Sequence, residues 1–194
     1  YIIKLLETEF EVLGVEARDG NRHFTINLAY PTVCEASEAL RPHIKLELTL
    51  SDLLLPDIDL PVSSFIREVI KQAPEVEKIA CINPVEIAAD KLSAITWRIP
   101  SRIRGENDKQ PDVVRHLHDL AKLSDKVLKS QNFEKLAQET IERDASRTDV
   151  LKNLSIGEKL SKMMDILEND PLYPLEYQVY VKEMVYTQDV NIPT

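Results

Sequence analysis

Lys91 lies in an otherwise apolar helical segment, at a spacing that could present its charge to an anion. Ile87 and Ala94 share its side of the helix, four residues before it and three after it. The lysine stem would lie along these neighbours, and its ammonium group would need an anionic partner or a route to solvent. Arg98 lies two turns further along the same face and could reach the same anion. The pattern therefore predicts an anion site on this helix, with a solvent-exposed lysine as the alternative.

The next helical segment places more charge on one of its sides. Four polar residues follow at i, i+3, i+4 and i+7, and so share one face: Asp112, Arg115, His116 and Asp119. Asp119 could accept a hydrogen bond from Arg115, orient Lys91, or act as a general base. His116 and His118, in contrast, point about 200° apart around a helix, so they cannot chelate one metal ion.

Positive charge is concentrated between these segments, although the formal net charge of the 194-residue chain is −9: Arg98, Arg102, Arg104 and Lys109. Phosphate contact in so acidic a protein must come from a local patch. Arg102 and Arg104 are therefore candidates for binding an acceptor such as RNA. A solvated, flexible loop is the alternative.

Two other groups of residues have a functional and a structural interpretation. Lys45 and Glu47 are two apart on an expected strand, so they emerge on the same face. They either form a solvated surface or place a metal-binding carboxylate beside a lysine that meets phosphate oxygens. Glu86 follows Asn83 by three residues, which predicts a capping box at the start of the Lys91 helix.

Hydrophobic periodicity predicts an α+β protein. A short helix is expected first, followed by strands at 9–17, 24–30, 44–50 and 78–82, with a turn at Asp19-Gly20. Residues 53–61 are expected to form a loop, before a short helix capped by Ser63 or Ser64. Helices are then expected at 84–98, ending at Pro100, and at 111–129, 132–146, 149–168 and 174–187. We expect two domains, residues 1–83 and 84–194.

Composition excludes several classes of protein. Cys34 and Cys81 are far apart in sequence and have no second pair, which favours neither a disulfide framework nor a zinc ribbon. The longest apolar runs are far too short to span a bilayer, so we expect no membrane association and a cytoplasmic location. With four glycines in the chain, a phosphate cradle built from backbone amides is not expected.

Three segments, read in order, resemble the later motifs of the AbiEii/AbiGii toxin family of nucleotidyltransferases: IKLEL at 44–48, PVEIAADKL at 84–92 and RHLHDLAKL at 115–123. The resemblance covers roughly residues 20–125. It implies part of a polymerase-beta-like nucleotidyltransferase core, with a mixed sheet, followed by an all-helical domain. It also implies a toxin of a bacterial toxin–antitoxin or phage-defence pair that uses a nucleoside triphosphate (NTP) and a divalent metal such as Mg2+.

The resemblance assigns roles to individual residues. Glu47 matches the strand carboxylate that joins the metal site, Lys91 the lysine that meets the triphosphate, and Asp119 the final aspartate of the last motif. Arg115 begins that motif, and His116 stands where family members often carry aspartate. The implied catalytic residues are Glu47, Lys91 and Asp119. The implied nucleotide-binding and phosphate-binding residues are Lys45, Lys91, Arg98 and Arg115.

The opening motif of that family, a glycine turn followed by an Asp-x-Asp strand, is not found. The only Asp-x-Asp, at residues 57–59, lies between prolines without a glycine turn, and the chain opens on Tyr1. We therefore expect the C-terminal portion of a nucleotidyltransferase toxin that transfers a nucleotidyl group from an NTP to RNA or protein. This portion should be inactive alone and should hold no tightly bound Mg2+ or NTP, because nucleotidyl transfer needs several carboxylates.

A different class of function is the alternative. The chain would then be a noncatalytic helical module that binds a protein partner such as an antitoxin, and its acidic balance would suit a basic partner. Whether the chain is an enzyme therefore stays open at this point. A helical domain with coincidental charges is a third possibility.

Overall fold

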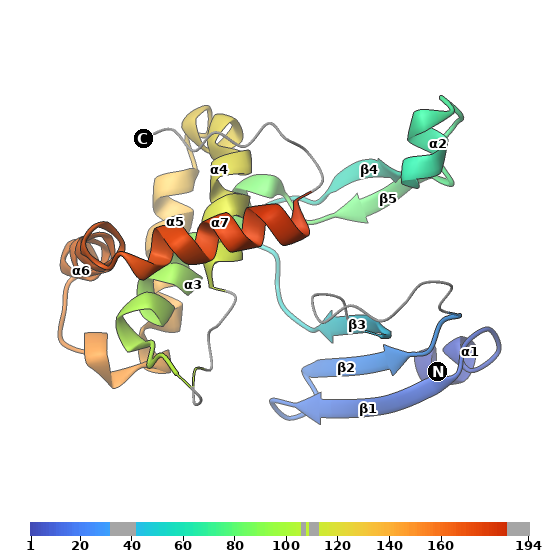
Figure 1. Cartoon of the computed structure of the whole chain (residues 1–194), viewed down its shortest axis with the longest axis horizontal. Coiled ribbons are helices and arrows are strands. Elements are labelled where there is room, and N and C mark those ends of the chain that lie inside the picture. The colour runs from blue at the N-terminus through green and yellow to red at the C-terminus, as the bar shows by residue number, and fades with distance from the viewer. Residues whose placement is uncertain (32–41, 106–107, 109–112, 186–194) are drawn as a thin grey trace. The chain divides into compact units, whose positions relative to one another are not determined.

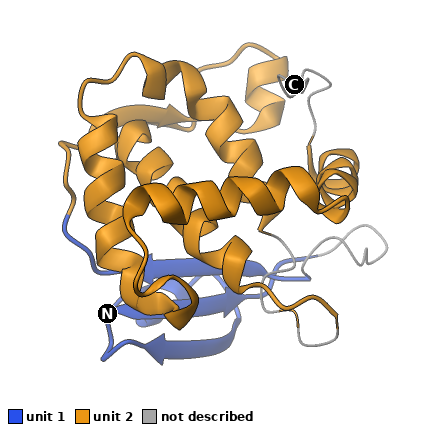
Figure 2. Cartoon of the chain, turned by 90° about the vertical axis from the view of Figure 1, so that its left-hand side faces the viewer, with its two compact units in different colours: residues 1–52 blue, residues 53–194 orange. Residues whose placement is uncertain are grey.

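The computed structural model describes residues 1–31, 42–105, 108 and 113–185. Backbone contacts divide the chain into two compact units, residues 1–52 and 53–194 (Figure 2). Both helices and small sheets are present, so the predicted α+β class is confirmed. The domain boundary predicted at residue 83 stays a prediction.

The first unit is a short helix and a three-stranded antiparallel sheet (Figure 1). Its elements are α1 (Ile2–Leu6), β1 (Val12–Arg18), β2 (His23–Leu28) and β3 (Ile44–Thr49). β1 and β2 are joined at the predicted turn, where Asp19, Gly20 and Asn21 have φ angles of 51°, 61° and 68°. Glycine, asparagine and aspartate tolerate this left-handed conformation best, which explains their presence at the turn.

The register between β2 and β3 separates a polar face from an apolar one. His23, Thr25 and Asn27 lie opposite Thr49, Glu47 and Lys45, respectively. The intervening residues form the apolar face, which includes the buried Ile26 and Leu28. The period-two pattern predicted this separation, since successive side chains of a strand point to opposite faces.

The second unit begins with a two-stranded antiparallel sheet and a short helix: β4 (Ile58–Val62), α2 (Phe65–Val69) and β5 (Val76–Cys81). The prediction of a loop over the whole of 53–61 is therefore wrong at residues 58–61. Pro61 argued against a strand, because a proline has no N–H group to donate to a neighbouring strand. The structure accommodates it at an irregularity, where the pairing of β4 with β5 shifts register between Leu60 and Val62. The predicted cap of α2 is confirmed, since Ser64 Oγ accepts a hydrogen bond from Arg67 N at 3.3 Å.

The rest of the described chain is mainly helical, but the predicted start of a helix at residue 149 is wrong, because that helix is capped by Ser155 and begins at Ile156. The helices are α3 (Pro84–Ser101), α4 (Val114–Leu128), α5 (Phe133–Arg143), α6 (Ile156–Asn169) and α7 (Leu172–Met184). Two short 3₁₀ segments, Asp144–Arg147 and Asp149–Leu151, connect α5 to α6. The predicted end at Pro100 is wrong by one residue, because α3 continues to Ser101 with the proline in its last turn.

Helix α3 is the centre of the helical part. It packs against α4, α5 and α6, and α7 packs against α4 (Figure 1). The main cluster of buried residues is Ile95, Ile99, Val113, Val114, Met163, Tyr173 and Tyr177. Burial of apolar surface drives this packing, and it fixes the positions of the charged residues on α3 and α4.

Asp144 links the end of α5 to α3. Its buried carboxylate accepts hydrogen bonds from Ser93 Oγ and Arg147 Nε, both at 2.9 Å. Burial by itself would raise the pKa of Asp144. Hydrogen bonds from Arg147 and Ser93 and the charges of Arg147 and Arg143 outweigh it and lower the pKa below the usual 3.8.

The lowered pKa of Asp144 predicts a pH-dependent contribution to stability. A carboxylate whose pKa is depressed in the folded state stabilises that state above its unfolded pKa, and this contribution disappears as the pH falls through the folded pKa. Asp144→Asn should therefore be less stable than the wild type at pH 7, with a difference that narrows below about pH 4. Urea unfolding of both proteins between pH 7 and pH 3 measures this. A difference that is constant with pH would contradict it.

Candidate functional site

Lys91 on α3 and Asp119 on α4 form an ion pair. Lys91 Nζ lies 2.7 Å from Asp119 Oδ2, and the two side chains are 27% and 36% exposed. Of the roles left open for Asp119, orienting Lys91 is the one that this contact supports. The pair is held by two packed helices but remains accessible to solvent, so a ligand could reach it.

His116 lies one helical turn before Asp119 on α4 and is 6% exposed. Neither ring nitrogen has a hydrogen-bond partner among the described residues. Burial lowers the pKa of His116 to about 4, helped by the positive charges of Lys91, Arg98 and Arg115 and opposed by Asp119. The ring is therefore neutral at physiological pH. The charges of the four predicted residues on α3 and α4 therefore all act on the pKa of this histidine.

His118 has different surroundings, as helical geometry predicts for residues two apart. Its Nδ1 lies 3.1 Å from the hydroxyl of Tyr177, and the ring of Tyr180 meets it edge-on at 5.7 Å. Both tyrosines belong to α7, so His118 contributes to the packing of α4 against α7. Among the residues that the structure describes, no three His, Cys, Asp or Glu side chains are grouped to hold a metal ion.

Glu86 does not form the predicted capping box. Asn83 caps α3 by accepting a hydrogen bond from Val85 N at 3.0 Å, whereas the buried Glu86 carboxylate accepts from Leu54 N and Leu55 N, each at 2.9 Å. A buried carboxylate must be paired or hydrogen-bonded, which explains why the side chain turns to these donors. Glu86 therefore ties the segment before β4 to the Lys91 helix.

Loss of these bonds should be measurable as a loss of stability. Glu86→Ala leaves the part-buried N–H groups of Leu54 and Leu55 without their charged acceptor, so we expect the free energy of unfolding to fall by about 3 kcal/mol. Urea unfolding followed by circular dichroism measures it. The matched control is Glu168→Ala on the exposed face of α6, for which we expect a change within about 0.5 kcal/mol. Equal effects of the two changes would contradict this role of Glu86.

Lys45 and Glu47 lie side by side on the polar face of β3, as predicted. Lys45 Nζ is 2.7 Å from Glu47 Oε1, and His23 Nε2 lies 3.9 Å from the same oxygen. His23 also shares a hydrogen bond with Thr49 Oγ1 at 2.9 Å. One carboxylate beside a lysine and a histidine does not by itself fit a resident Mg2+ site, since this ion needs several oxygen ligands. His23 was not predicted as part of this group. It joins Lys45 and Glu47 because β2 and β3 pair in an antiparallel register that puts His23 on the same polar face.

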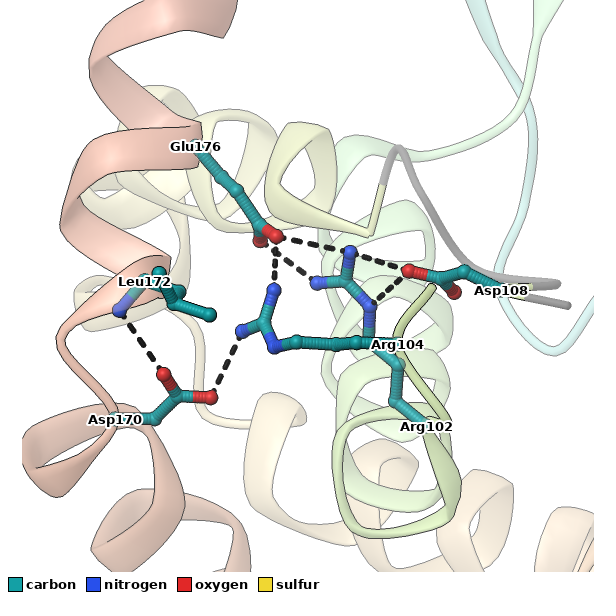
Figure 3. A network of polar contacts seen from close by, with 6 residues as sticks. All are labelled: Arg102, Arg104, Asp108, Asp170, Leu172 and Glu176. Carbon is teal, nitrogen blue, oxygen red and sulfur yellow. Dashed lines mark hydrogen bonds and ion pairs between the residues drawn. The ribbon is translucent and has the colours of Figure 1, made fainter. Parts of the chain in front are cut away.

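Arg102 and Arg104 both contact carboxylates of the helical part (Figure 3). The Arg102 side chain is 4% exposed and lies 2.7 Å from both Asp108 and Glu176. Arg104 also pairs with Glu176, and lies 2.8 Å from Asp170. Neither guanidinium is therefore simply solvated. The sequence identified both arginines as candidate binding residues, but it did not predict the carboxylates with which they pair.

Arg104 has a further contact within this cluster, because its guanidinium lies over the ring of Tyr173, 4.4 Å from the centroid. The cluster therefore joins the segment after α3 to the start of α7. Acceptor binding by the two arginines stays a prediction. Cys34, Lys109 and Asp112 lie outside the described residues.

None of the described helices is long and apolar enough to cross a membrane. Searches among curated proteins and among solved structures gave no significant match. A family model described as nucleotidyl transferase AbiEii toxin, type IV toxin–antitoxin system, matches residues 2–191, a longer stretch than the motifs alone indicated. The chain therefore belongs to the AbiEii family of nucleotidyl transferase toxins.

Proposed function

We propose that this chain binds the polyphosphate of an NTP at the Lys91–Asp119 pair, as part of a toxin that transfers a nucleotidyl group. The observation that carries the proposal is the accessible ion pair of Lys91 with Asp119, at 2.7 Å. A polyphosphate presents several anionic oxygens, and Lys91 can donate to them while Asp119 keeps it in position. Membership of the family supports the nature of the ligand.

Each predicted residue receives a role in this proposal. Lys91, with Arg98 and Arg115 around it, neutralises the negative charge on the phosphates, which grows as the nucleotidyl group is transferred. Asp119 orients Lys91 and affects catalysis only by keeping this lysine in position. Lys45 and Glu47 belong to the first unit, and their phosphate-binding and metal-binding roles stay predictions.

The divalent metal enters the proposal with the substrate. The family generally uses an NTP with a divalent ion, and Mg2+ is commonly bound by one or two carboxylates together with substrate phosphates. Glu47, which belongs to the first unit, is the carboxylate that we propose for such an ion. The ion would reduce the charge repulsion between the phosphates and the attacking acceptor.

The acceptor that we propose is RNA or a protein. Contact of an RNA phosphate with Arg102 or Arg104 would have to compete with Glu176 and Asp170, which already contact these guanidiniums. The glycine turn with Asp-x-Asp is not among these 194 residues. We therefore propose that transfer, unlike binding, needs carboxylates supplied outside them. A cytoplasmic location and control by an antitoxin belong to the same proposal.

A transfer assay on the natural full-length protein tests this function. The protein is incubated with Mg2+, RNA and each NTP labelled at its α-phosphate, and label on RNA or on protein is measured. We expect transfer by the wild type, and none by the variant with Lys91 changed to methionine. Undiminished transfer by that variant would overturn the assignment of Lys91.

One observation favours the second candidate, a noncatalytic module that binds a protein such as an antitoxin. Phe65, Ile66 and Val69 of α2 are 73%, 72% and 80% exposed, and exposed apolar groups of this kind often mark contact sites. If this function holds, the chain binds an antitoxin but no NTP, and changing the three residues to serine weakens the complex. Calorimetry with each ligand separates the two candidates.

A further inference from the structure

Lys159 on α6 is a charged side chain in the interior of the second unit. Only 6% of this residue is exposed. No hydrogen bond or ion pair joins its side chain to another residue that the structure describes. Because a buried charge is costly unless it is paired or hydrogen-bonded, its ammonium group needs either a bound ligand or a route to solvent.

A small cavity lies beside Lys159, where α6 meets α3, the end of α5 and the two 3₁₀ segments. The volume open to the centre of a water molecule is about 10 Å³. One buried water needs about 10–15 Å³ by the same measure. The polar side chains that line the cavity include Ser93, Thr96, Asp144, Thr148 and Lys159. The cavity therefore has room for one water and polar groups to hold it, but no room for a larger ligand.

Two of the lining side chains can accept a further hydrogen bond. Asp144 Oδ2 accepts from Ser93 Oγ at 2.9 Å, and a carboxylate oxygen has a second lone pair for another donor. Thr96 Oγ1 donates to Leu92 O at 2.7 Å, which leaves the lone pairs of the hydroxyl available. Lys159, in contrast, offers donors only. A molecule that accepts one hydrogen bond and donates two would therefore satisfy all three groups.

The two charged groups decide between a water molecule and an ion. Asp144 would repel an anion in this cavity and Lys159 would repel a cation, whereas a neutral water interacts favourably with both. We propose that the cavity binds one water molecule, which accepts a hydrogen bond from Lys159 and donates to Asp144 and Thr96. The water joins α6 to α3 and to the end of α5 as a bridge between two opposite charges. This inference is independent of the proposed nucleotide site at Lys91.

A crystal structure of the whole chain, at a resolution that shows ordered water, tests the proposal directly. We expect one water within about 3.2 Å of both Lys159 Nζ and a carboxylate oxygen of Asp144. An ammonium group that points to the outer surface, or a cavity that holds no water, would overturn the proposal.

The same site can be tested in solution, because magnetic relaxation dispersion of water counts the long-lived waters inside a protein. We expect Lys159→Met to hold one such water fewer than the wild type, since methionine keeps a long unbranched side chain but offers no donor. The matched control is Lys135→Met, which removes the same charge from an exposed position on α5 and should leave the number unchanged. Equal numbers in the wild type and Lys159→Met would contradict the bridge.

A measurement on the wild type alone decides the matter if Lys159→Met does not fold. Brief acetylation of the whole chain should modify Lys159 at least about tenfold more slowly than Lys135, since an enclosed amine is reached only when the structure opens locally. The Lys135 side chain is 81% exposed and serves as the internal reference. Equal rates would show that the Lys159 amine lies in solvent, and the proposed water site would then fail.

Discussion

Replacement of Arg102 by alanine is expected to lower the free energy of unfolding by about 3 kcal/mol, since breaking a buried ion pair leaves charges without compensation. The guanidinium is almost fully buried and contacts two carboxylates, Asp108 and Glu176, at 2.7 Å. Glu176 also pairs with Arg104, so it would keep one of its partners. Asp108 would lose the hydrogen bonds from Arg102. Urea unfolding at pH 7 measures the change.

The matched control is Arg18→Ala. Arg18 also pairs with a carboxylate at 2.8 Å, that of Glu16, but both side chains are more than half exposed. An exposed pair contributes little, so we expect a loss below about 0.5 kcal/mol. If Arg102→Ala were as mild as this control, the arginine cluster would not hold the start of α7 to the segment after α3.

Replacement of Lys91 by methionine is expected to weaken the binding of a magnesium–triphosphate complex at least hundredfold, or about 2.8 kcal/mol. Methionine keeps a long unbranched side chain against the apolar neighbours on α3 but removes the charge. The exposure of the pair means that stability should fall by no more than about 1 kcal/mol. Titration calorimetry at two salt concentrations measures the affinity, and the salt dependence should weaken with the loss of the charge.

Lys135→Met is the control for this change. Lys135 lies on α5, is 81% exposed and pairs only loosely, at 3.7 Å, with Glu139. The substitution Lys135→Met removes one positive charge from the protein, as Lys91→Met does, but at a distant surface position. We therefore expect the affinity for the magnesium–triphosphate complex to stay within about twofold of the wild type. If the two variants lost affinity equally, net charge and not a site at Lys91 would explain the binding.

The candidate site was predictable where its geometry is local. Residues three and four apart share a helical face, and this rule placed Lys91 with Arg98 and placed Arg115 with Asp119. The sequence left three roles open for Asp119, and one of them was to orient Lys91. Only the packing of α3 against α4 shows that these two side chains meet. Strand alternation likewise placed Lys45 beside Glu47.

Contacts between distant parts of the sequence were not predictable. Glu86 satisfies its carboxylate with the amides of Leu54 and Leu55, more than 30 residues earlier, while a local motif suggested a capping box. Arg102 meets Glu176 across 74 residues, so the loop pattern alone indicated surface exposure. β4 was missed for a related reason: Pro61 argued against a strand whose partner, β5, comes later in the chain.

The chemical reactivity of Lys91 reports directly on whether nucleotide binds at this side chain. The chain is acetylated at lysine for a short time, with and without a magnesium–NTP complex, and each modified lysine is quantified by mass spectrometry. We expect the nucleotide to protect Lys91 several-fold, while the exposed Lys135 and Lys152 react as before. Saturating nucleotide that leaves the acetylation of Lys91 unchanged would contradict it.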